Sequence, residues 1–179
     1  MTQVGSVYGE ALYSLARDEG LDKTVLEQLK VLEQSFSQEP GFLKLLSAPN
    51  LSKDERCKVL DDCFRGKVHA YVLNFLKILT EKGYIRRFSE CVEAFRQQYN
   101  ADHGILCVTA VTAVPLTKVQ EAKLCAKLAG ITGKTIDLAN RVDPSCMGGM
   151  RLDYDGKRLD DTVSHRLDAI GSLLKNTVL

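Results

Sequence analysis

Apolar side chains recur every three or four positions through the N-terminal half of the chain. This period matches one face of an α-helix, so each such stretch predicts a helix. The stretches are 4–16, 25–36, 42–46, 59–64, 68–79 and 85–99. Residues that commonly end helices follow several of them, namely Gly20, Pro40, Pro49, Gly83 and Gly104. Six helices are therefore predicted, and the fifth, 68–79, has an unusually wide apolar face.

Two pairs of polar residues indicate where helices begin. Ser52 and Glu55 have the spacing of a capping box, in which each side chain bonds a free backbone amide of the other residue. Thr117 and Gln120 repeat this spacing. The pairs predict one helix that begins after position 52 and another that begins after position 117 and ends at Gly130.

The period changes after Gly104. Residues 105–114 are rich in β-branched side chains and predict a well-covered strand, and alternation predicts two more strands at 136–142 and 150–154. Asp155-Gly156 favours a type I′ turn, so 157–159 are expected to return antiparallel to 150–154. Helical spacing of Val163, Leu167, Ile170 and Leu174 predicts a final helix.

These elements predict two domains. The fold class is an N-terminal all-α six-helix bundle, residues 1–103, followed by a small α+β domain of order β-α-β-β-α, residues 104–179. The second domain is too short for a nucleotide-binding doubly wound sheet of the usual size. The join around 100–104 is short, and the sixth helix is long enough to run directly into the second domain.

Composition excludes several classes of protein. The chain is 45% hydrophobic and 26% charged with a net charge of +1, and the two signs alternate, so it has no broad basic surface for nucleic acid. The longest apolar stretch, 105–116, is well short of the roughly 20 residues that a membrane-spanning helix needs. Residues 1–10 carry no secretory or transit signal, so a cytoplasmic protein is expected.

No catalytic or metal-binding motif stands out. The six cysteines are dispersed without a Cys-x-x-Cys pair, and Cys63, Cys107 and Cys125 lie among apolar neighbours, which predicts packing residues. The histidines, His69, His103 and His165, fall in different predicted elements. We predict no catalytic residue, no cofactor and no metal.

A cluster of aspartates leaves a second interpretation open. Asp153, Asp155, Asp160 and Asp161 are close enough in sequence for a metal or acid–base site, but their spacing fails the calcium-loop pattern. The turn accounts for Asp155, and the N-terminus of the last helix accounts for Asp160 or Asp161. Gly148-Gly149 is expected to mark a bulge or a close backbone contact.

Two stretches carry a resemblance to a known family. The first is 8–12, and the second, more specific one is 143–167. The second contains Gly148-Gly149, alternating apolar residues, a short hairpin, the segment 159–163 and then Arg166-Leu167, and this order matches the family signature. Both resemble ATP synthase delta subunits, and element order over the whole chain is similar to the mitochondrial oligomycin-sensitivity-conferring protein. Three positions depart from the family pattern: Gly9 in place of Ala, Met147 in place of Ile or Leu, and Thr162 in place of Ser.

The resemblance implies a protein without chemistry of its own that connects the stator of an F-type ATP synthase. It implies that the helical domain grips the N-terminal helices of the alpha subunits in a groove between the first and fifth helices, and that the second domain reaches the b-type peripheral stalk. Carried over to this sequence, the groove residues are Tyr8, Ala11, Leu12, Phe75, Ile78 and Leu79. The signature residues are Gly148, Gly149, Asp160, Thr162, Arg166 and Leu167. The alternative for the groove residues is that all six are core.

The resemblance also implies a location. The protein is expected at the cytoplasmic face of the cell membrane, held there only through the complex and without nucleic acid. The main alternative from another class is a helical RNA-binding adapter of transcription, which near-neutral charge disfavours. A small enzyme that uses the aspartates is the third.

Overall fold

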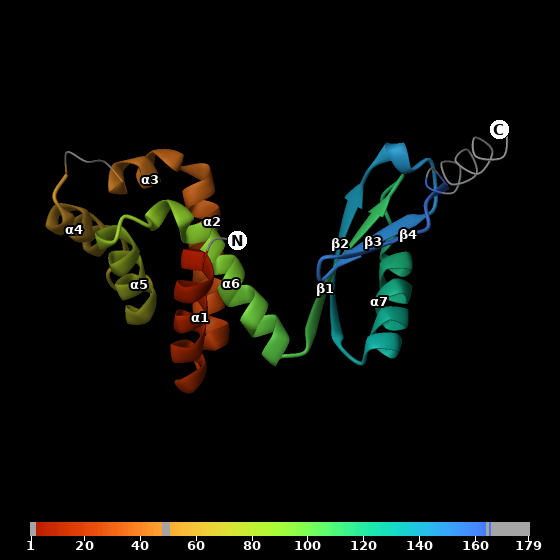
Figure 1. The fold of residues 1–179 in the computed structure, drawn as a ribbon, viewed down its shortest axis with the longest axis horizontal. Helices are drawn as coiled ribbons and strands as arrows, with labels where there is room; N and C mark the ends of the chain where they lie inside the picture. Colours follow the sequence, from red (N-terminus) through yellow and green to blue (C-terminus); the bar gives the residue numbers. More distant parts are fainter. Residues whose placement is uncertain (1–2, 48–50, 164, 166–179) are drawn as a thin grey trace, which may run out of the picture. The chain divides into compact units, whose positions relative to one another are not determined.

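The computed structural model describes residues 3–47, 51–163 and 165. The chain divides into two compact units, Met1–Tyr99 and Asn100–Leu179, here called the helical unit and the α+β unit. Figure 1 shows both. The division falls within the sixth helix, whereas the sequence placed it between 103 and 104, just after that helix ends.

The described part of the helical unit consists of six α-helices. Each predicted helical stretch overlaps one of them, although the sixth helix begins only after a 3₁₀ turn at Ile85–Arg87. Ser52 and Glu55 form both bonds of the predicted capping box. The helices are α1 (Gln3–Asp18), α2 (Asp22–Gln38), α3 (Pro40–Leu46), α4 (Lys53–Phe64), α5 (Ala70–Glu81) and α6 (Phe88–Asp102).

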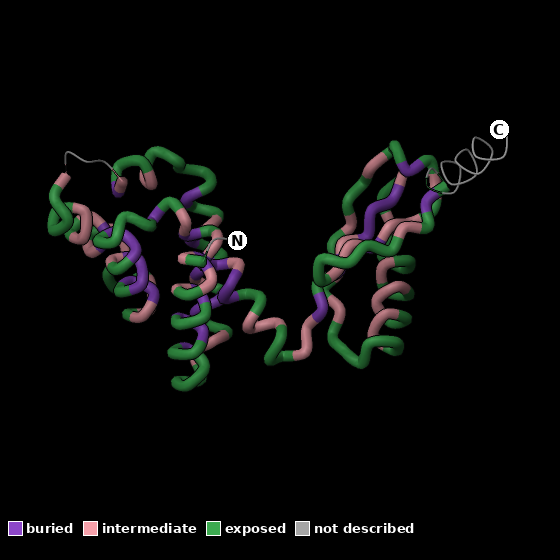
Figure 2. The backbone as a smooth tube through the Cα atoms, in the orientation of Figure 1, coloured by how far each residue is buried: buried purple, intermediate pink, exposed green. Residues whose placement is uncertain are grey.

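One continuous core fills the helical unit. Figure 2 shows buried segments along the helices that line it. The ring of Phe36 contacts three other rings of the core. Its centroid lies 5.1 Å from that of Phe88, 5.7 Å from that of Phe42 and 6.2 Å from that of Phe64. Aromatic contacts of this kind add to the stabilisation from burial, so helices distant in sequence are fixed at one point.

Helices α1 and α6 approach each other very closely. A Cβ atom added to Gly9 would lie 2.4 Å from the carbonyl oxygen of Cys91, and one added to Gly5 would lie 2.8 Å from Cβ of Glu90. A turn further on, the rings of Tyr13 and Phe95 meet edge to face at 5.3 Å. Only glycine permits this backbone contact, so Gly9 has a structural role in this chain.

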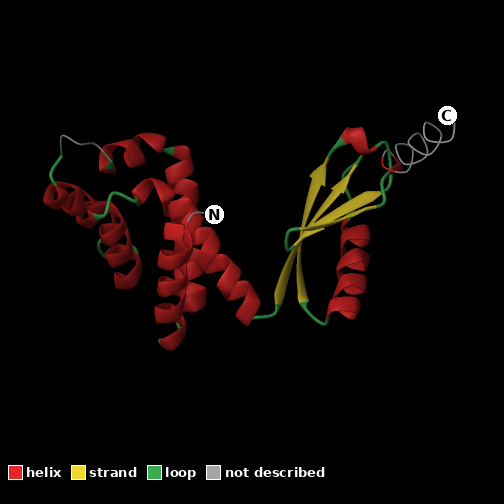
Figure 3. Cartoon of the chain, viewed as in Figure 1, coloured by secondary structure: helices red, strands yellow, loops and turns green. Residues whose placement is uncertain are grey.

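The α+β unit is built on a four-stranded sheet in the order β2-β1-β3-β4. β1 pairs in parallel with β2 and antiparallel with β3, which pairs antiparallel with β4. Figure 3 shows helix α7 beside this sheet. The elements are β1 (Ile105–Thr112), α7 (Lys118–Thr132), β2 (Thr135–Val142), β3 (Met150–Tyr154) and β4 (Lys157–Asp160).

The structure corrects one detail of the predicted α+β order. The returning segment after the Asp155-Gly156 turn is a full fourth strand, so the order β-α-β-β-α omits β4. The turn itself is as predicted, with φ of 44° at Asp155 and 70° at Gly156. The final helix, predicted from Val163 to Leu174, lies almost entirely outside the described residues.

Helix α7 begins as predicted and ends later than predicted. Thr117 and Gln120 form both bonds of the capping box. The helix continues through Gly130 to Thr132, and Gly133, with φ of 66°, caps it. The prediction that Gly130 ends the helix is therefore wrong, because Gly133 is the residue that adopts the left-handed conformation common at helix ends.

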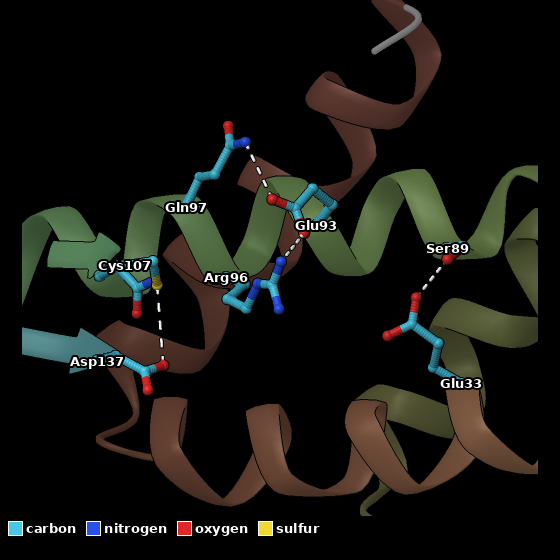
Figure 4. A network of polar contacts seen from close by, with 8 residues as sticks. Glu33, Ser89, Glu93, Arg96, Gln97, Cys107 and Asp137 are labelled. Atoms are coloured by element: carbon cyan, nitrogen blue, oxygen red, sulfur yellow. Dashed lines mark hydrogen bonds and ion pairs between the residues drawn. The ribbon is translucent and has the colours of Figure 1, made fainter. Parts of the chain in front are cut away.

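The core of the α+β unit lies between the sheet and α7. Leu106, Val108 and Ala110 of β1 are buried there together with Leu152 of β3. Neighbouring residues of a strand face opposite sides, so Cys107 points away from this core and is exposed. The prediction that Cys107 is a packing residue is therefore wrong. Its sulfur accepts a hydrogen bond from Asn100 at 3.1 Å and lies 3.9 Å from Asp137 (Figure 4).

Candidate partner-binding site

Helix α5, the predicted partner-binding helix, is fixed at its N-terminus by polar contacts. Nδ1 of His69 accepts a hydrogen bond from the backbone amide of Tyr71 at 3.3 Å and caps the helix. The backbone amide of His69 donates to the side-chain oxygen of Gln28 on α2 at 2.8 Å. The start of α5 is therefore tied to a helix more than forty positions earlier in the chain.

An ion pair holds the flank of α5 that faces α4. Nζ of Lys77 lies 2.8 Å from a carboxylate oxygen of Asp61. The hydrogen bond from Lys77 lowers the pKa of Asp61, and the positive charge of Arg65 acts in the same direction. Together with the α2 contact, this pair leaves α5 anchored on two sides.

The structure separates the six predicted groove residues into two groups. Leu12, Phe75 and Leu79 are at most 6% exposed and belong to the core, as the alternative interpretation holds. Ala11 is exposed and Ile78 is 44% exposed. Tyr8 is half-buried, and its ring centroid lies 6.1 Å from that of Tyr84.

Three further apolar residues are accessible that sequence reasoning did not assign to the site. Val7 is 57% exposed, Leu15 43% and Tyr84 36%. Val7, Ala11 and Leu15 are four residues apart, so they follow one side of α1, and Tyr8 adjoins that side. The α1–α5 surface is defined here as Val7, Tyr8, Ala11, Leu15, Ile78 and Tyr84.

Helix α1 thus has two apolar faces. Gly5, Gly9, Leu12, Tyr13 and Ala16 form the buried one. The α1–α5 surface contains the other, and the two are joined through Tyr8. Exposed apolar residues at helical spacing are suited to receive an amphipathic helix.

A separate hollow of the helical unit lies beside α2. It has a volume of about 400 Å³, and Val31, Leu32, Phe64 and Val68 supply its apolar lining. Glu27 and Lys67 are among its polar residues. Val31 is 62% exposed, which makes it a useful comparison with the apolar residues of the α1–α5 surface.

The predicted signature residues that the structure describes meet in one cluster of the α+β unit. Gly149 has φ of 77°, and a Cβ atom added to it would lie 2.4 Å from the carbonyl oxygen of Asp161. The backbone amide of Val163 donates to the carbonyl oxygen of Gly148 at 3.0 Å. The glycine pair therefore makes the close backbone contact expected of it. Arg166 and Leu167 lie outside the described residues.

Thr162 occupies the centre of this cluster and is 3% exposed. Its hydroxyl donates to a carboxylate oxygen of Asp160 at 2.7 Å and accepts from the amide of His165 at 3.2 Å. Its own amide donates to the same oxygen of Asp160 at 3.0 Å. Thr162 stands where the family usually has serine, and its hydroxyl still forms these hydrogen bonds.

The bonds from Thr162 change the acidity of Asp160. They lower the pKa of this carboxyl, and the nearby charges of His165 and Arg151 lower it further. An ionised carboxylate is the better acceptor, so the folded cluster favours the charged form. The cluster holds backbone segments together, and its geometry contains no nucleophile–base pair.

The other aspartates of the predicted acidic cluster have separate contacts. Asp153 accepts a hydrogen bond from Arg158 at 3.0 Å, and Asp155 stands in the hairpin turn. In the part of the chain that the structure describes, no three His, Cys, Asp or Glu residues are grouped so that they could hold a metal ion. None of the described helices has the length and apolarity to cross a membrane.

The exposed side of α6 carries several polar contacts. Glu93 accepts from Gln97 at 3.2 Å and pairs with Arg96, while Ser89 donates to Glu33 of α2. Figure 4 shows these contacts. They lie on the solvent side of α6, so this face offers charged groups where the α1–α5 surface offers apolar ones.

Comparison with known proteins points to one family. The family model described as ATP synthase delta (OSCP) subunit matches residues 4–174. A protein named ATP synthase subunit delta from Alkaliphilus oremlandii is 33% identical over 164 residues, which is 92% of this chain and 91% of that protein. One of the same name from Prochlorococcus marinus (strain MIT 9301) is 27% identical over 172 residues, 96% of each chain.

A solved structure shares the fold. A chain of the Toxoplasma gondii mitochondrial ATP synthase hexamer superposes with a TM-score of 0.76 over 97% of this chain and 98% of that one. The sequence identity is 21%, so this likeness bears on the fold alone.

Proposed function

Because this chain belongs to the ATP synthase delta (OSCP) subunit family, we propose that it connects the catalytic head of an F-type ATP synthase to the peripheral stalk. It is a subunit without catalysis of its own. In this proposal the helical unit, as one six-helix bundle, binds the N-terminal helices of the alpha subunits, and the α+β unit binds the b-type stalk. The connection holds the head against rotor torque, so that proton transport drives ATP synthesis.

The α1–α5 surface supports the head-binding half of the proposal. Five of its residues come from two helices that contact each other, Tyr84 follows the second of them, and the core beneath is continuous. Removal of apolar surface from water contributes about 25 cal/mol per Å², so an amphipathic alpha-subunit helix would gain most of its binding energy from these side chains. Buried Leu12, Phe75 and Leu79 support the surface from below.

The proposal places the protein at the cytoplasmic face of the cell membrane, peripheral and held only through the complex. The cluster around Thr162 supports the stalk-binding half indirectly, because it fixes the end of β4 against the glycine pair. A connector that transmits force needs such fixed backbone segments.

Isothermal titration with a synthetic peptide of the alpha subunit's N-terminal helix tests the head-binding half. We expect saturable one-to-one binding with a negative heat-capacity change, as apolar burial requires. The variants are Val7→Asp and Ile78→Asp, since both side chains are exposed and can be replaced without opening the core. Each should weaken binding by about tenfold or more, because a charge would be buried against apolar surface.

Val31→Asp is the matched control. Val31 is as exposed as Val7 but lies on α2 beside the separate hollow, so its replacement should leave binding unchanged. If Val31→Asp abolished binding while Val7→Asp and Ile78→Asp did not, the hollow beside α2 would be the head-binding site instead of the α1–α5 surface. If the peptide failed to bind the native chain but RNA bound it at low salt, the adapter function would replace the stator function.

A further inference from the structure

Helix α5 begins with an unusual capping residue. Ser, Thr, Asp and Asn commonly cap the N-termini of helices, and Ser52 and Thr117 do so at α4 and α7. At α5 the cap is His69, whose Nδ1 accepts a hydrogen bond from the backbone amide of Tyr71 at 3.3 Å. Of these three capping side chains, the histidine is the one of a type that changes charge near neutral pH.

The hydrogen bond at Nδ1 requires the neutral imidazole. A neutral imidazole has one nitrogen that accepts hydrogen bonds, whereas both nitrogens of the protonated ring are donors. Protonation of His69 therefore removes the acceptor from the Tyr71 amide. It also places a positive charge at the N-terminus of a helix, where the helix dipole disfavours it.

His69 also joins α5 to the rest of the helical unit. Its backbone amide donates to Oε1 of Gln28 on α2 at 2.8 Å, and its carbonyl oxygen accepts from the amide of Leu73 at 3.1 Å. Its ring lies against that of Tyr71, with the centroids 4.9 Å apart. One half-buried residue thus holds both the first turn of α5 and the contact of that turn with α2.

The charges around His69 do not offset a proton on its ring. The first turn of α5 contains no acidic residue, and no described residue forms an ion pair with His69. Lys67, two positions earlier, carries a charge of the same sign. On α2 the residue that His69 contacts, Gln28, is neutral, and Glu27 lines the hollow beside α2 together with Lys67. The protonated ring therefore loses one hydrogen bond and gains no carboxylate partner.

Two titratable contacts between α4 and α5 keep their charge near neutral pH. The hydrogen bond from Lys77 lowers the pKa of Asp61, so this carboxylate stays ionised where histidine titrates. Burial raises the pKa of Cys57, which donates to Glu81, so this thiol stays protonated. Compared with these two groups, only the histidine is of a type that titrates between about pH 5.5 and 7.5.

We propose that His69 is a proton-sensitive cap, and that uptake of one proton by its imidazole releases the first turn of α5. The neutral ring stabilises this turn, so the stabilisation is present at high pH and is lost as the pH falls through the range in which histidine is protonated. The same helix contributes Ile78 to the α1–α5 surface. The release needs no partner, so its test is independent of the proposed function.

Nuclear magnetic resonance of the full chain follows the proton directly. As the pH is lowered from about 7.5 to about 5.5, the ring nitrogens of His69 and the backbone amide of Tyr71 should shift with one common midpoint. The reason is that the hydrogen bond between them depends on the protonation of Nδ1. A Tyr71 amide that does not follow the protonation of His69 would contradict the proposal.

Amide hydrogen exchange measures the release of the turn. After correction for the intrinsic pH dependence of exchange, opening at Tyr71, Val72 and Leu73 should become about fivefold or more frequent at the lower pH, as expected for the loss of an N-cap. In His69→Asn the cap is retained and does not titrate, so the opening should change by less than about twofold. His69→Ala has no cap and should open frequently at both pH values.

Two further variants make the result decisive. His103→Asn is the matched control, because His103 is exposed and follows the end of α6, and it should leave the pH response of α5 in place. His69→Asp repeats the test with a second capping residue, which stays ionised at both pH values. A response that disappears in His69→Asn and His69→Asp but persists in His103→Asn supports the proposal. Equal responses in the native chain and in both capping variants would overturn it.

Discussion

The two units of this chain use their apolar side chains in opposite ways. Among the described residues, the helical unit gathers twenty buried residues into one core, whereas the cluster between α7 and the sheet contains four. Val114, Val119, Ile131 and Met147 of the α+β unit are more than 60% exposed. The helical unit is thus stabilised mainly by burial, and the α+β unit depends more on strand pairing and local hydrogen bonds.

Truncation of one core residue in each unit should give the largest effects and separate the units most clearly. Phe95→Ala removes a fully buried ring and should cost about 3–5 kcal/mol in the helical unit. Leu106→Ala should cost about 2 kcal/mol in the α+β unit, because its surroundings are thinner and collapse more easily. Hydrogen exchange of the full chain, followed by mass spectrometry, assigns each loss of protection. Equal losses in both units after Phe95→Ala would contradict the comparison.

The close contact between α1 and α6 should be the next most sensitive feature. Gly9→Ala places a methyl group 2.4 Å from the carbonyl oxygen of Cys91, so the helices must separate. Overpacking of this kind costs about 1–3 kcal/mol, measurable by chemical denaturation. Gly41→Ala, at an open helical position, is the control and should not destabilise the protein. A stable Gly9→Ala protein would show that the two helices can move apart at little cost.

The two capping boxes offer the same perturbation in both units. Ser52→Ala and Thr117→Ala each remove an N-cap and should cost about 1 kcal/mol. The consequences should differ, because α4 packs on the large core and α7 has no fully buried residue. Amide exchange should therefore increase along much of α7 after Thr117→Ala, but only in the first turn of α4 after Ser52→Ala. If amide exchange increased equally far along both helices, the size of the core would not determine how far the loss of an N-cap is felt.

The smallest predicted effect is a pH dependence of the α+β unit around Asp160. Bonds from Thr162 lower the folded-state pKa of Asp160. Stability from this carboxylate is therefore fully present above the ordinary pKa of aspartate and is lost as pH falls through the lowered value. Asp160→Asn should reduce the acid sensitivity of exchange around β4. Asp155→Asn, in the adjacent turn, is the control and should leave that sensitivity in place.

Local signals in the sequence predicted the elements, but not which apolar faces are buried. The capping boxes at Ser52 and Thr117 and the turn at Asp155-Gly156 are decided by residues within a few positions, and all three are confirmed. Gly130 and Gly133 are equally plausible helix ends, and only the backbone geometry shows which one adopts positive φ.

Burial at the candidate site depends on neighbours that are distant in sequence. Helical spacing alone cannot distinguish the apolar residues of α1 that pack on α6 from those that stay exposed, so Val7 and Leu15 were not assigned to the site while buried Phe75 and Leu79 were. Alternation in β1 likewise does not reveal that α7 covers the side opposite Cys107.

The central position of β1 also affects what happens when the α+β unit opens. β1, Ile105–Thr112, contains no charged residue, is rich in β-branched side chains, and is paired on both edges by β2 and β3. Strands of this composition form cross-β assemblies when their edges are free. We therefore expect a substitution that loosens this thin unit to expose an aggregation-prone segment, so that insoluble protein accompanies the loss of the fold.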